Sequence, residues 1–231
     1  MYLTSFDINR ARRGAQKLLG SPHAMHAAVL SSFPPTAVQV GPDGGRILWR
    51  VDTSPRATRL YVASPERPDL TALVEQAGWP TAATWQTSAY EPFLSSLVEG
   101  SVWGLRLLAN PTRAVPPARV DTASTTARGK RVAHVTAEQQ LGWFVSRAES
   151  IGLDVVGPQG PTVAVTAREV RKFRRENAQV TLSTARFDGV ARITDVTLLR
   201  QAMRAGIGPA KGYGCGLLTL APTASDPWSG D

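Results

Sequence analysis

The chain has 231 residues, 42% of them hydrophobic, and its 26 Lys and Arg against 18 Asp and Glu give a formal net charge of +8. This length and composition are those of a folded protein with one large domain or two of about 100 residues each. No apolar run reaches the roughly 18 residues of a membrane-spanning helix. The N-terminus shows no secretory signal, and the single cysteine excludes an internal disulfide, so we expect a cytoplasmic protein.

Arginine dominates the basic residues, because only Lys17, Lys130, Lys172 and Lys211 are lysines. An excess of positive charge favours nucleic acid as a partner through steering and counterion release. Arginine adds bidentate phosphate contacts and stacking on bases. A coding bias towards Arg explains the ratio of Arg to Lys but not the excess of positive charge.

Sequence patterns in the first half predict the order β-α-β-β-α-β. Ser21 followed by Pro22 is typical of an N-cap with proline at the first helical position, so the main helix is expected to begin there. Residues 79–97 show no decisive pattern. The expected strands are residues 1–9, 46–51, 59–63 and 102–110, and the expected helices are residues 11–31 and 69–77.

The second half repeats this order in outline, after a stretch rich in Pro, Ala, Ser and Thr. The expected strands are residues 131–135, 163–170, 179–193 and 217–220, with helices from residue 136 and at 196–205. We therefore predict an α+β fold of two tandem ferredoxin-like (RRM-like) βαββαβ domains. The predicted division is an N-terminal domain at 1–113, a linker at 114–128, a C-terminal domain at 129–223 and a disordered tail at 224–231.

Two histidines, His23 and His26, stand three residues apart just inside the main helix, so both lie on one helical face. A neutral imidazole near pH 7 takes or gives a proton, which suits general acid–base cleavage of RNA. In that reaction a base deprotonates the 2′-hydroxyl, the 2′-oxygen attacks the adjacent phosphorus, and an acid protonates the departing 5′-oxygen. The alternative is two surface histidines, or one packed against the core beside Met25.

A zinc site is the competing interpretation of the histidines. It would draw on His23, His26, His134 and Cys215, whose spacing fits no standard pattern. We therefore predict no bound metal and no cofactor.

The densest basic run places five positive charges within eight residues. On a strand or hairpin arm, alternate residues share a face, so the run has two basic faces that can follow the phosphates of an RNA stem. A solvated loop is the alternative, but these charges repel one another without a partner. The run consists of Arg168, Lys172 and Arg174 on one face and of Arg171, Phe173 and Arg175 on the other. Arg10, Arg12 and Arg13, just before the histidines, form a second basic group that either holds RNA or is solvated.

A glycine-rich loop at residues 206–216 lies between the last helix and the last strand. Its glycines permit positive φ and close approach to another molecule, and its free N–H groups with Lys211 form a candidate phosphate site. The order helix, loop, strand is the reverse of a P-loop, and the P-loop motif is absent. A tight turn against a neighbouring strand is the alternative. The candidate RNA contacts in the loop are Gly206, Gly208, Lys211, Gly212 and Gly214.

The run "GIGPAKGYGCGLLTLAP" resembles the glycine-rich signature of the CRISPR-associated endoribonucleases that process repeat RNA, most closely the CasE branch. Three other stretches match in the same order: "MYLTSFDIN", "PHAMHAAVLSSFP", and "LRLLANPTR" followed by "GKRVAH". Together they span nearly the whole chain. The resemblance implies an RNA-cleaving subunit of the Cascade complex with two ferredoxin-like domains and a basic hairpin against the RNA stem.

The resemblance also implies roles for the histidines. In the CasE family the catalytic histidine lies in a helix a few residues before a Phe-Pro pair, and His26 has this spacing to Phe33 and Pro34. Relatives often carry tyrosine at the position of His23, so His23 either acts as the base or binds phosphate. Some relatives have basic residues where this chain has Ala27 and Ser31, so the resemblance leaves open which basic residue stabilises the transition state here.

We therefore expect a metal-independent endoribonuclease that binds the stem-loop of the CRISPR repeat and cuts once at the 3′ base of the stem. By resemblance, the products are a 2′,3′-cyclic phosphate or 3′-phosphate and a 5′-hydroxyl, and the enzyme keeps the mature guide RNA for assembly with other Cascade subunits. One alternative is a non-catalytic RNA-binding subunit with the same fold. Another is an enzyme that binds a small phosphorylated metabolite at the glycine loop, which leaves the basic run unexplained.

Overall fold

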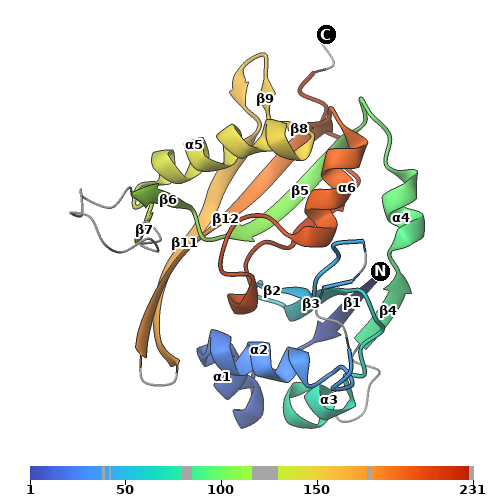
Figure 1. The fold of residues 1–231 in the computed structure, drawn as a ribbon, viewed down its shortest axis with the longest axis vertical. Coiled ribbons are helices and arrows are strands. Elements are labelled where there is room, and N and C mark those ends of the chain that lie inside the picture. Colours follow the sequence, from blue (N-terminus) through green and yellow to red (C-terminus); the bar gives the residue numbers. More distant parts are fainter. Residues whose placement is uncertain (38–39, 42, 80–84, 116–129, 176–177, 229–231) are drawn as a thin grey trace, which may run out of the picture.

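A computed structural model describes residues 1–231 except 38–39, 42, 80–84, 116–129, 176–177 and 229–231. A four-stranded and a five-stranded antiparallel sheet form the framework of the fold (Figure 1), and apart from the short β8, which pairs with β12, the two sheets have the same strand order. Both sheets place their last strand beside the first, then the third, then the second, which is the ferredoxin-like order. The predicted fold class is confirmed.

The first unit has the strand order β2-β3-β1-β4, and its helices α1, α2 and α3 pack on one side of the sheet. Phe6, Met25, Leu60 and Leu73 fill the core between them. The elements are β1 (Tyr2–Asp7), α1 (Arg13–Gly20), α2 (Pro22–Leu30), β2 (Leu48–Thr53), β3 (Thr58–Ser64), α3 (Thr71–Ala77) and β4 (Trp85–Ala89), followed by α4 (Glu91–Ser96).

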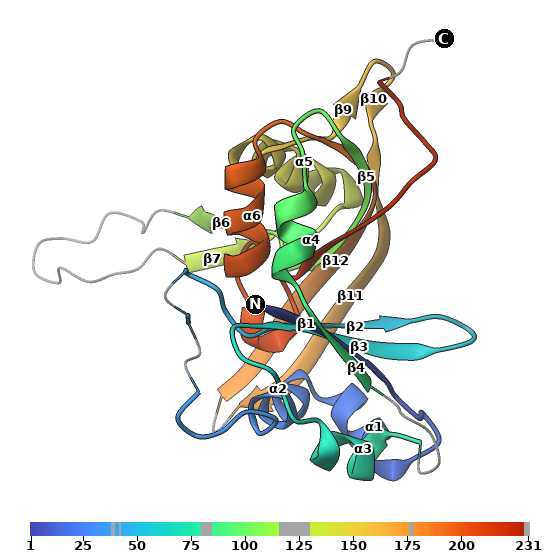
Figure 2. The same ribbon diagram turned by 90° about the vertical axis from the view of Figure 1, so that its right-hand side faces the viewer.

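The second unit has the strand order β11-β12-β5-β13, and α5 and α6 cover it. Leu107, Phe144, Phe187 and Leu199 lie in its core. Figure 2 shows the strands of the first sheet running across the long β11 and β12. The main elements are β5 (Val102–Ala109), α5 (Ala137–Ala148), β11 (Val163–Arg175), β12 (Ala178–Ile193), α6 (Val196–Ala205) and β13 (Leu218–Ala221). The short ones are β6 (Thr112–Val115), β7 (Lys130–Ala133), η1 (Glu149–Ile151), β8 (Leu153–Asp154), β9 (Val156–Gly157), β10 (Gly160–Pro161) and η2 (Lys211–Tyr213).

The strand predicted at residues 102–110 exists, but its assignment to the first unit is wrong. It is β5, which pairs with β12 and β13 of the second sheet, and the fourth strand of the first sheet is β4 in the unassigned stretch 79–97. Similarly, the strand predicted at 131–135 is β7, which pairs with β6 in a separate ribbon. Alternation of apolar residues predicts a strand but not the sheet that it joins.

These pairings bear on the predicted domain boundaries. We propose that the two units meet between α4 and β5, which makes the predicted linker an insertion within the second unit. Residues 114 and 115 of that linker belong to β6, and residues 116–128 lie outside the described residues. In the predicted tail, the Trp228 ring lies 5.1 Å from the Arg192 guanidinium, while residues 229–231 lie outside the described residues.

Helix starts follow the predicted caps. The Ser21 hydroxyl accepts a hydrogen bond from the Ala24 N–H at 3.3 Å, and α2 begins at Pro22 as predicted. Thr136 and Gln139 form the capping box of α5. Both caps satisfy N–H groups that a helix start leaves without partners.

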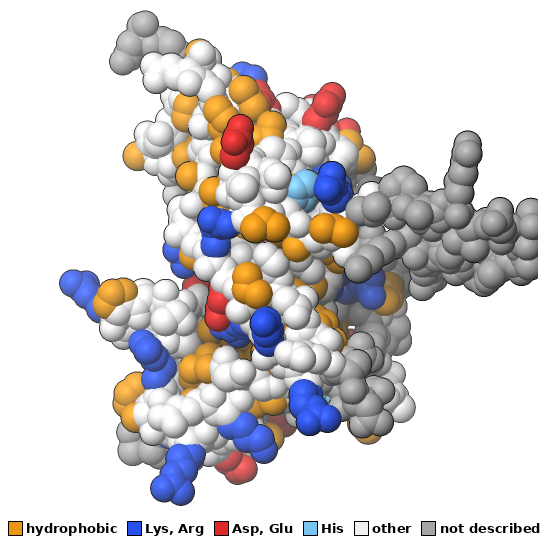
Figure 3. All heavy atoms as spheres, turned by 90° about the vertical axis from the view of Figure 1, so that its left-hand side faces the viewer, with side chains coloured by type: hydrophobic (Ala, Val, Ile, Leu, Met, Phe, Trp, Pro, Cys, Tyr) orange, Lys and Arg blue, Asp and Glu red, His pale blue; other side chains and the backbone are white. Residues whose placement is uncertain are grey.

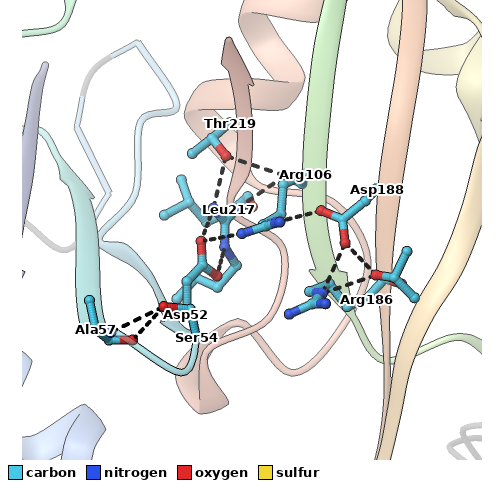
Figure 4. A network of polar contacts seen from close by, with 10 residues as sticks. Asp52, Ser54, Ala57, Arg106, Arg186, Asp188, Leu217 and Thr219 are labelled. Atoms are coloured by element: carbon cyan, nitrogen blue, oxygen red, sulfur yellow. Dashed lines mark hydrogen bonds and ion pairs between the residues drawn. The ribbon is translucent and has the colours of Figure 1, made fainter.

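A network of charged side chains joins the two units (Figure 4). Asp52 of β2 binds Arg106 of β5, which binds Asp188 of β12. Burial alone would raise the pKa of Asp188, but hydrogen bonds from Thr166 and Arg106 and the charges of Arg106 and Arg186 hold that pKa below its ordinary value of 3.8. The network therefore stabilises the folded state at pH values above the ordinary pKa of an aspartate. This contribution is lost as the pH falls through the lowered pKa of Asp188.

Candidate active site and nucleic-acid interface

His26 lies on α2 beside the first core. The neighbouring Met25 and Val29 are fully buried, whereas His26 is half-buried and faces β2. Its Nδ1 accepts a hydrogen bond from the indole Nε1–H of Trp49, at 3.3 Å. Trp49 is 4% exposed, so the core holds the indole that orients the imidazole.

This hydrogen bond fits one tautomer of the neutral imidazole. In a neutral imidazole whose Nδ1 accepts this bond, the ring hydrogen is on Nε2. In this state Nε2 can donate a hydrogen bond to a phosphate oxygen. To act as a base through Nε2 the ring must move its hydrogen to Nδ1, and to act as an acid it must gain a second proton. Either change puts a hydrogen on Nδ1, so the bond from Trp49 to Nδ1 belongs to the neutral imidazole before proton transfer.

The glycine-rich loop closes over the other edge of His26. A β-carbon added at Gly212 would lie 3.2 Å from Nε2 of His26, and one added at Gly214 would lie 2.7 Å from the Trp49 ring. Gly214 also has a φ of 83°, in the region that favours glycine. The loop of the second unit therefore packs tightly on the histidine of the first unit.

The other candidate RNA contacts of the loop also have protein neighbours. A β-carbon at Gly206 would meet Leu48, and one at Gly208 would meet Trp143. The Nζ of Lys211 donates to the Gly208 carbonyl at 2.6 Å. Burial lowers the pKa of Lys211, and the charges of nearby arginines lower it further. These glycines therefore allow the loop to pack closely against other side chains of the same protein.

His23 lies one turn before His26 on α2 and is exposed. The two histidines thus have different surroundings, since only His26 lies between Trp49 and the loop. The exposed position leaves His23 accessible to a phosphate from solvent.

The basic arm is the hairpin of β11 and β12, which extends past α1 and α2 (Figure 1). Its residues alternate as predicted: Arg168, Lys172 and Arg174 are exposed, and Arg171 and Phe173 are half-buried. The half-buried face contacts the first unit and the loop, because Arg171 donates to the Leu19 carbonyl at 3.5 Å and Phe173 packs edge-on against Tyr213. Arg175 ends β11, and its side chain lies outside the described part of the structure.

Figure 3 shows Lys and Arg side chains over the lower half of the face that carries this arm, with few Asp and Glu among them. Such a surface attracts a polyanion.

The arginines before α2 divide into two roles. Arg10 and Arg13 are exposed. Arg12 instead donates to the carbonyls of Val74, Glu75 and Gly78 at the end of α3. Carbonyls at a helix C-terminus lack partners and attract positive charge, so Arg12 is a helix cap here and the structure does not favour it as an RNA contact.

The described residues contain no group of three His, Cys, Asp or Glu side chains placed to hold a metal ion. Cys215 is fully buried, and burial raises the pKa of its thiol to about 12. Within the described part of the chain, no helix is long and apolar enough to cross a membrane.

Comparison with known proteins places the chain in a family. A family model described as "CRISPR associated protein" matches residues 1–222. The chain belongs to this family. It is 29% identical over 231 residues to the CRISPR-associated endoribonuclease Cse3 of Thermus thermophilus, a match that covers 96% of this chain and 100% of the relative. The Cascade subunit CasE of Escherichia coli is 30% identical over 120 residues, which make up 51% of this chain and 56% of that protein.

Solved structures of this family agree with the fold. Cse3 bound to a 19-nucleotide RNA matches with a TM-score of 0.78 at 26% identity, over 96% of this chain and 100% of that chain. The resemblance to the CasE branch is therefore confirmed.

Trp49 and Tyr213 are site residues that sequence reasoning missed. Trp49 lies in "RILWRV", where it is one apolar residue of a strand, and Tyr213 lies among the glycines of the loop at 206–216. A polar N–H on a buried aromatic side chain is the only signal that the sequence offers for Trp49.

Proposed function

We propose that this chain is a metal-independent endoribonuclease that binds the stem-loop of a CRISPR repeat in precursor RNA and cuts it once at the 3′ base of the stem. The observation that carries the proposal is the position of His26, held by Trp49 under the glycine-rich loop, which contacts the basic arm through Tyr213 and Phe173. The RNA-bound endoribonuclease Cse3, which matches over nearly the whole chain, supports the same substrate.

In the proposed reaction the 2′-oxygen attacks the adjacent phosphorus, and the bond from phosphorus to the 5′-oxygen breaks. The proton of the 2′-hydroxyl passes to a base and another proton reaches the 5′-oxygen from an acid, with His26 as one of these two groups. The products are a 2′,3′-cyclic phosphate, or the 3′-phosphate after hydrolysis, and a 5′-hydroxyl. The enzyme acts in the cytoplasm, retains the guide RNA and joins the other Cascade subunits, as the Escherichia coli relative does by name.

A second function is a non-catalytic RNA-binding subunit. Ala27 and Ser31 favour it, because neither supplies a positive charge beside His26. Incubation with the repeat RNA in EDTA separates the two functions. Cleavage supports the nuclease, binding without cleavage supports the second function, and the absence of both contradicts both functions.

Gly212→Ala is expected to lower the single-turnover cleavage rate roughly tenfold, because the new methyl displaces His26 by a few tenths of an ångström and small misplacements slow catalysis. Lys211→Ala is expected to have a smaller effect. Gly142→Ala is the control, since a β-carbon at this position in α5 meets no atom within 4 Å. A wild-type rate for Gly212→Ala shows that the loop is only a turn.

Replacing Lys172 and Arg174 together by Ala is expected to weaken RNA binding and reduce its salt dependence. Each lost phosphate contact removes about 0.9 from the slope of log affinity against log salt concentration on a duplex. Binding is measured at several salt concentrations. Arg192→Ala is the control because Arg192 pairs with Asp154 at the other end of β12. An unchanged slope in the double variant means that the arm is merely solvated.

A further inference from the structure

A cleft of about 380 Å³ lies where the two units meet. Its volume is at the lower end for small-ligand pockets, which begin at roughly 300 Å³, so it suits one nucleoside and not a helix. Apolar side chains line its inner part, together with the ring of Tyr213 and the small exposed part of Trp49. The apolar lining comes from Leu18, Leu19, Met25, Val51, Leu108 and Leu182, and the rim carries Arg10, Arg168, Arg171, Arg186 and Glu169.

A β-bulge in β11 builds one wall of this cleft. Val165 pairs with Phe187, a core residue, but Ala167 pairs with Arg186 on the other face of the sheet. The bulge therefore turns Ala167, Glu169 and Arg171 towards the first unit. Glu169 and Arg171 form an ion pair of 2.8 Å, so a carboxylate and a guanidinium stand side by side at the rim.

The cleft adjoins His26. Trp49 lines the cleft and also donates its indole hydrogen to the imidazole. Tyr213 and Gly214 line it too, and both follow Gly212, the residue that packs on Nε2 of His26. If a nucleobase occupies the cleft, the sugar and phosphate of the same nucleotide therefore lie close to His26.

The proposed chemistry requires a binding site for an unstacked base. Attack by the 2′-oxygen needs this atom, the phosphorus and the leaving 5′-oxygen in line, and regular stacking in an A-form strand keeps the 2′-oxygen to one side. Reaction therefore needs a near-attack geometry in which a nucleotide beside the scissile phosphate is unstacked. An unstacked base loses contact energy unless aromatic and apolar side chains replace its neighbours.

We propose that this cleft receives the unstacked nucleobase of one of the two nucleotides that flank the scissile phosphate. The base contacts Trp49, Tyr213 and the leucines, and its edge meets the Glu169–Arg171 pair. The rim arginines hold the adjoining phosphates. This proposal rests on the proposed function, since it concerns the RNA that the chain cleaves.

The test is a cycle of one protein change and one RNA change. Ala167→Trp fills the cleft from its exposed wall, and the RNA carries an abasic nucleotide on one side of the scissile phosphate or on the other. With wild-type protein, one of the two abasic RNAs is expected to react about tenfold or more slowly, because stacking on aromatic side chains is worth about 5- to 150-fold per base. Ala167→Trp is expected to lower the cleavage rate of the intact RNA by a similar factor. It is expected to lower the cleavage rate of this abasic RNA less than twofold, because the protein change and the RNA change remove the same contact.

Two further variants keep the test decisive. Thr53→Trp fills the same cleft from β2 if Ala167→Trp does not fold, and Val98→Trp adds the same bulk at an exposed residue outside it. The proposal is overturned if filling the cleft leaves the intact RNA unaffected, or if the effects of the protein and RNA changes multiply for both abasic RNAs. If the chain binds RNA without cutting it, the same cycle is measured in Kd, so the failure of the proposed cleavage is distinguished from failure of the cleft.

Discussion

His26→Ala is expected to lower the single-turnover rate of repeat-RNA cleavage by about 100-fold or more, the usual share of a general acid or base. RNA binding is expected to change little, because one neutral imidazole contributes little beside an arginine-rich surface. The measurement is the rate with enzyme in excess and EDTA present. The structure supports this expectation, because His26 is the histidine placed between Trp49 and the glycine loop.

The matched variants are at His23, the exposed neighbour on the same helix. His23→Ala is expected to reduce the rate less than His26→Ala if His23 only positions the RNA, and comparably if His23 is the second proton-transfer group. His23→Tyr is expected to be tolerated, since the resemblance implies tyrosine at this position in relatives. Cleavage near the wild-type rate by His26→Ala would falsify the assignment of His26.

Local signals in the sequence were sufficient for the start of α2 and α5 and for most strands. A cap is a bond between near neighbours, so Ser21 and Thr136 reveal it directly. Membership of a sheet is set by contacts between distant segments, and the residues of β5 carry no sign that their partners are β12 and β13 rather than β1. This is why the fold class was predicted correctly and the position of β5 was not.

For the site, too, the sequence shows local features but not contacts between distant segments. The position of His26 in a helix was readable from the chain, whereas its hydrogen bond from Trp49 joins residues 23 positions apart. For Arg12 the sequence suggests a solvent-exposed charge or an RNA contact. In the structure, carbonyls more than 60 positions away accept its hydrogen bonds. Charge alone does not tell which arginines the protein uses for itself.

Arg50 is the clearest case of an arginine that the fold uses internally. Its side chain is 2% exposed, and its five N–H donors meet five acceptors. Two bonds, of 2.8 and 3.0 Å, go to the Asp52 carboxylate on the same strand. The other three cross to the second unit and reach the Arg106 carbonyl, the Leu217 carbonyl and the Thr219 hydroxyl. Arg50 thereby fixes the first unit, with His26, against the strand that follows the glycine loop.

Arg50→Leu is expected to destabilise the protein by about 3 to 5 kcal/mol, because it leaves one oxygen of the partly buried Asp52 carboxylate and three further acceptors without their donor. For a chain of this size the corresponding fall in Tm is on the order of 10 °C, read from thermal melts followed by circular dichroism. Arg50→Lys is expected to recover only a small part, since a single ammonium has three donors and cannot replace the planar fork. Arg59→Leu is the control: Arg59 pairs with Asp7 at the surface, and loss of an exposed pair costs about 1 kcal/mol or less. Equal melting temperatures for the Arg50 and Arg59 variants would show that the units are held together by their apolar contacts and not by this arginine.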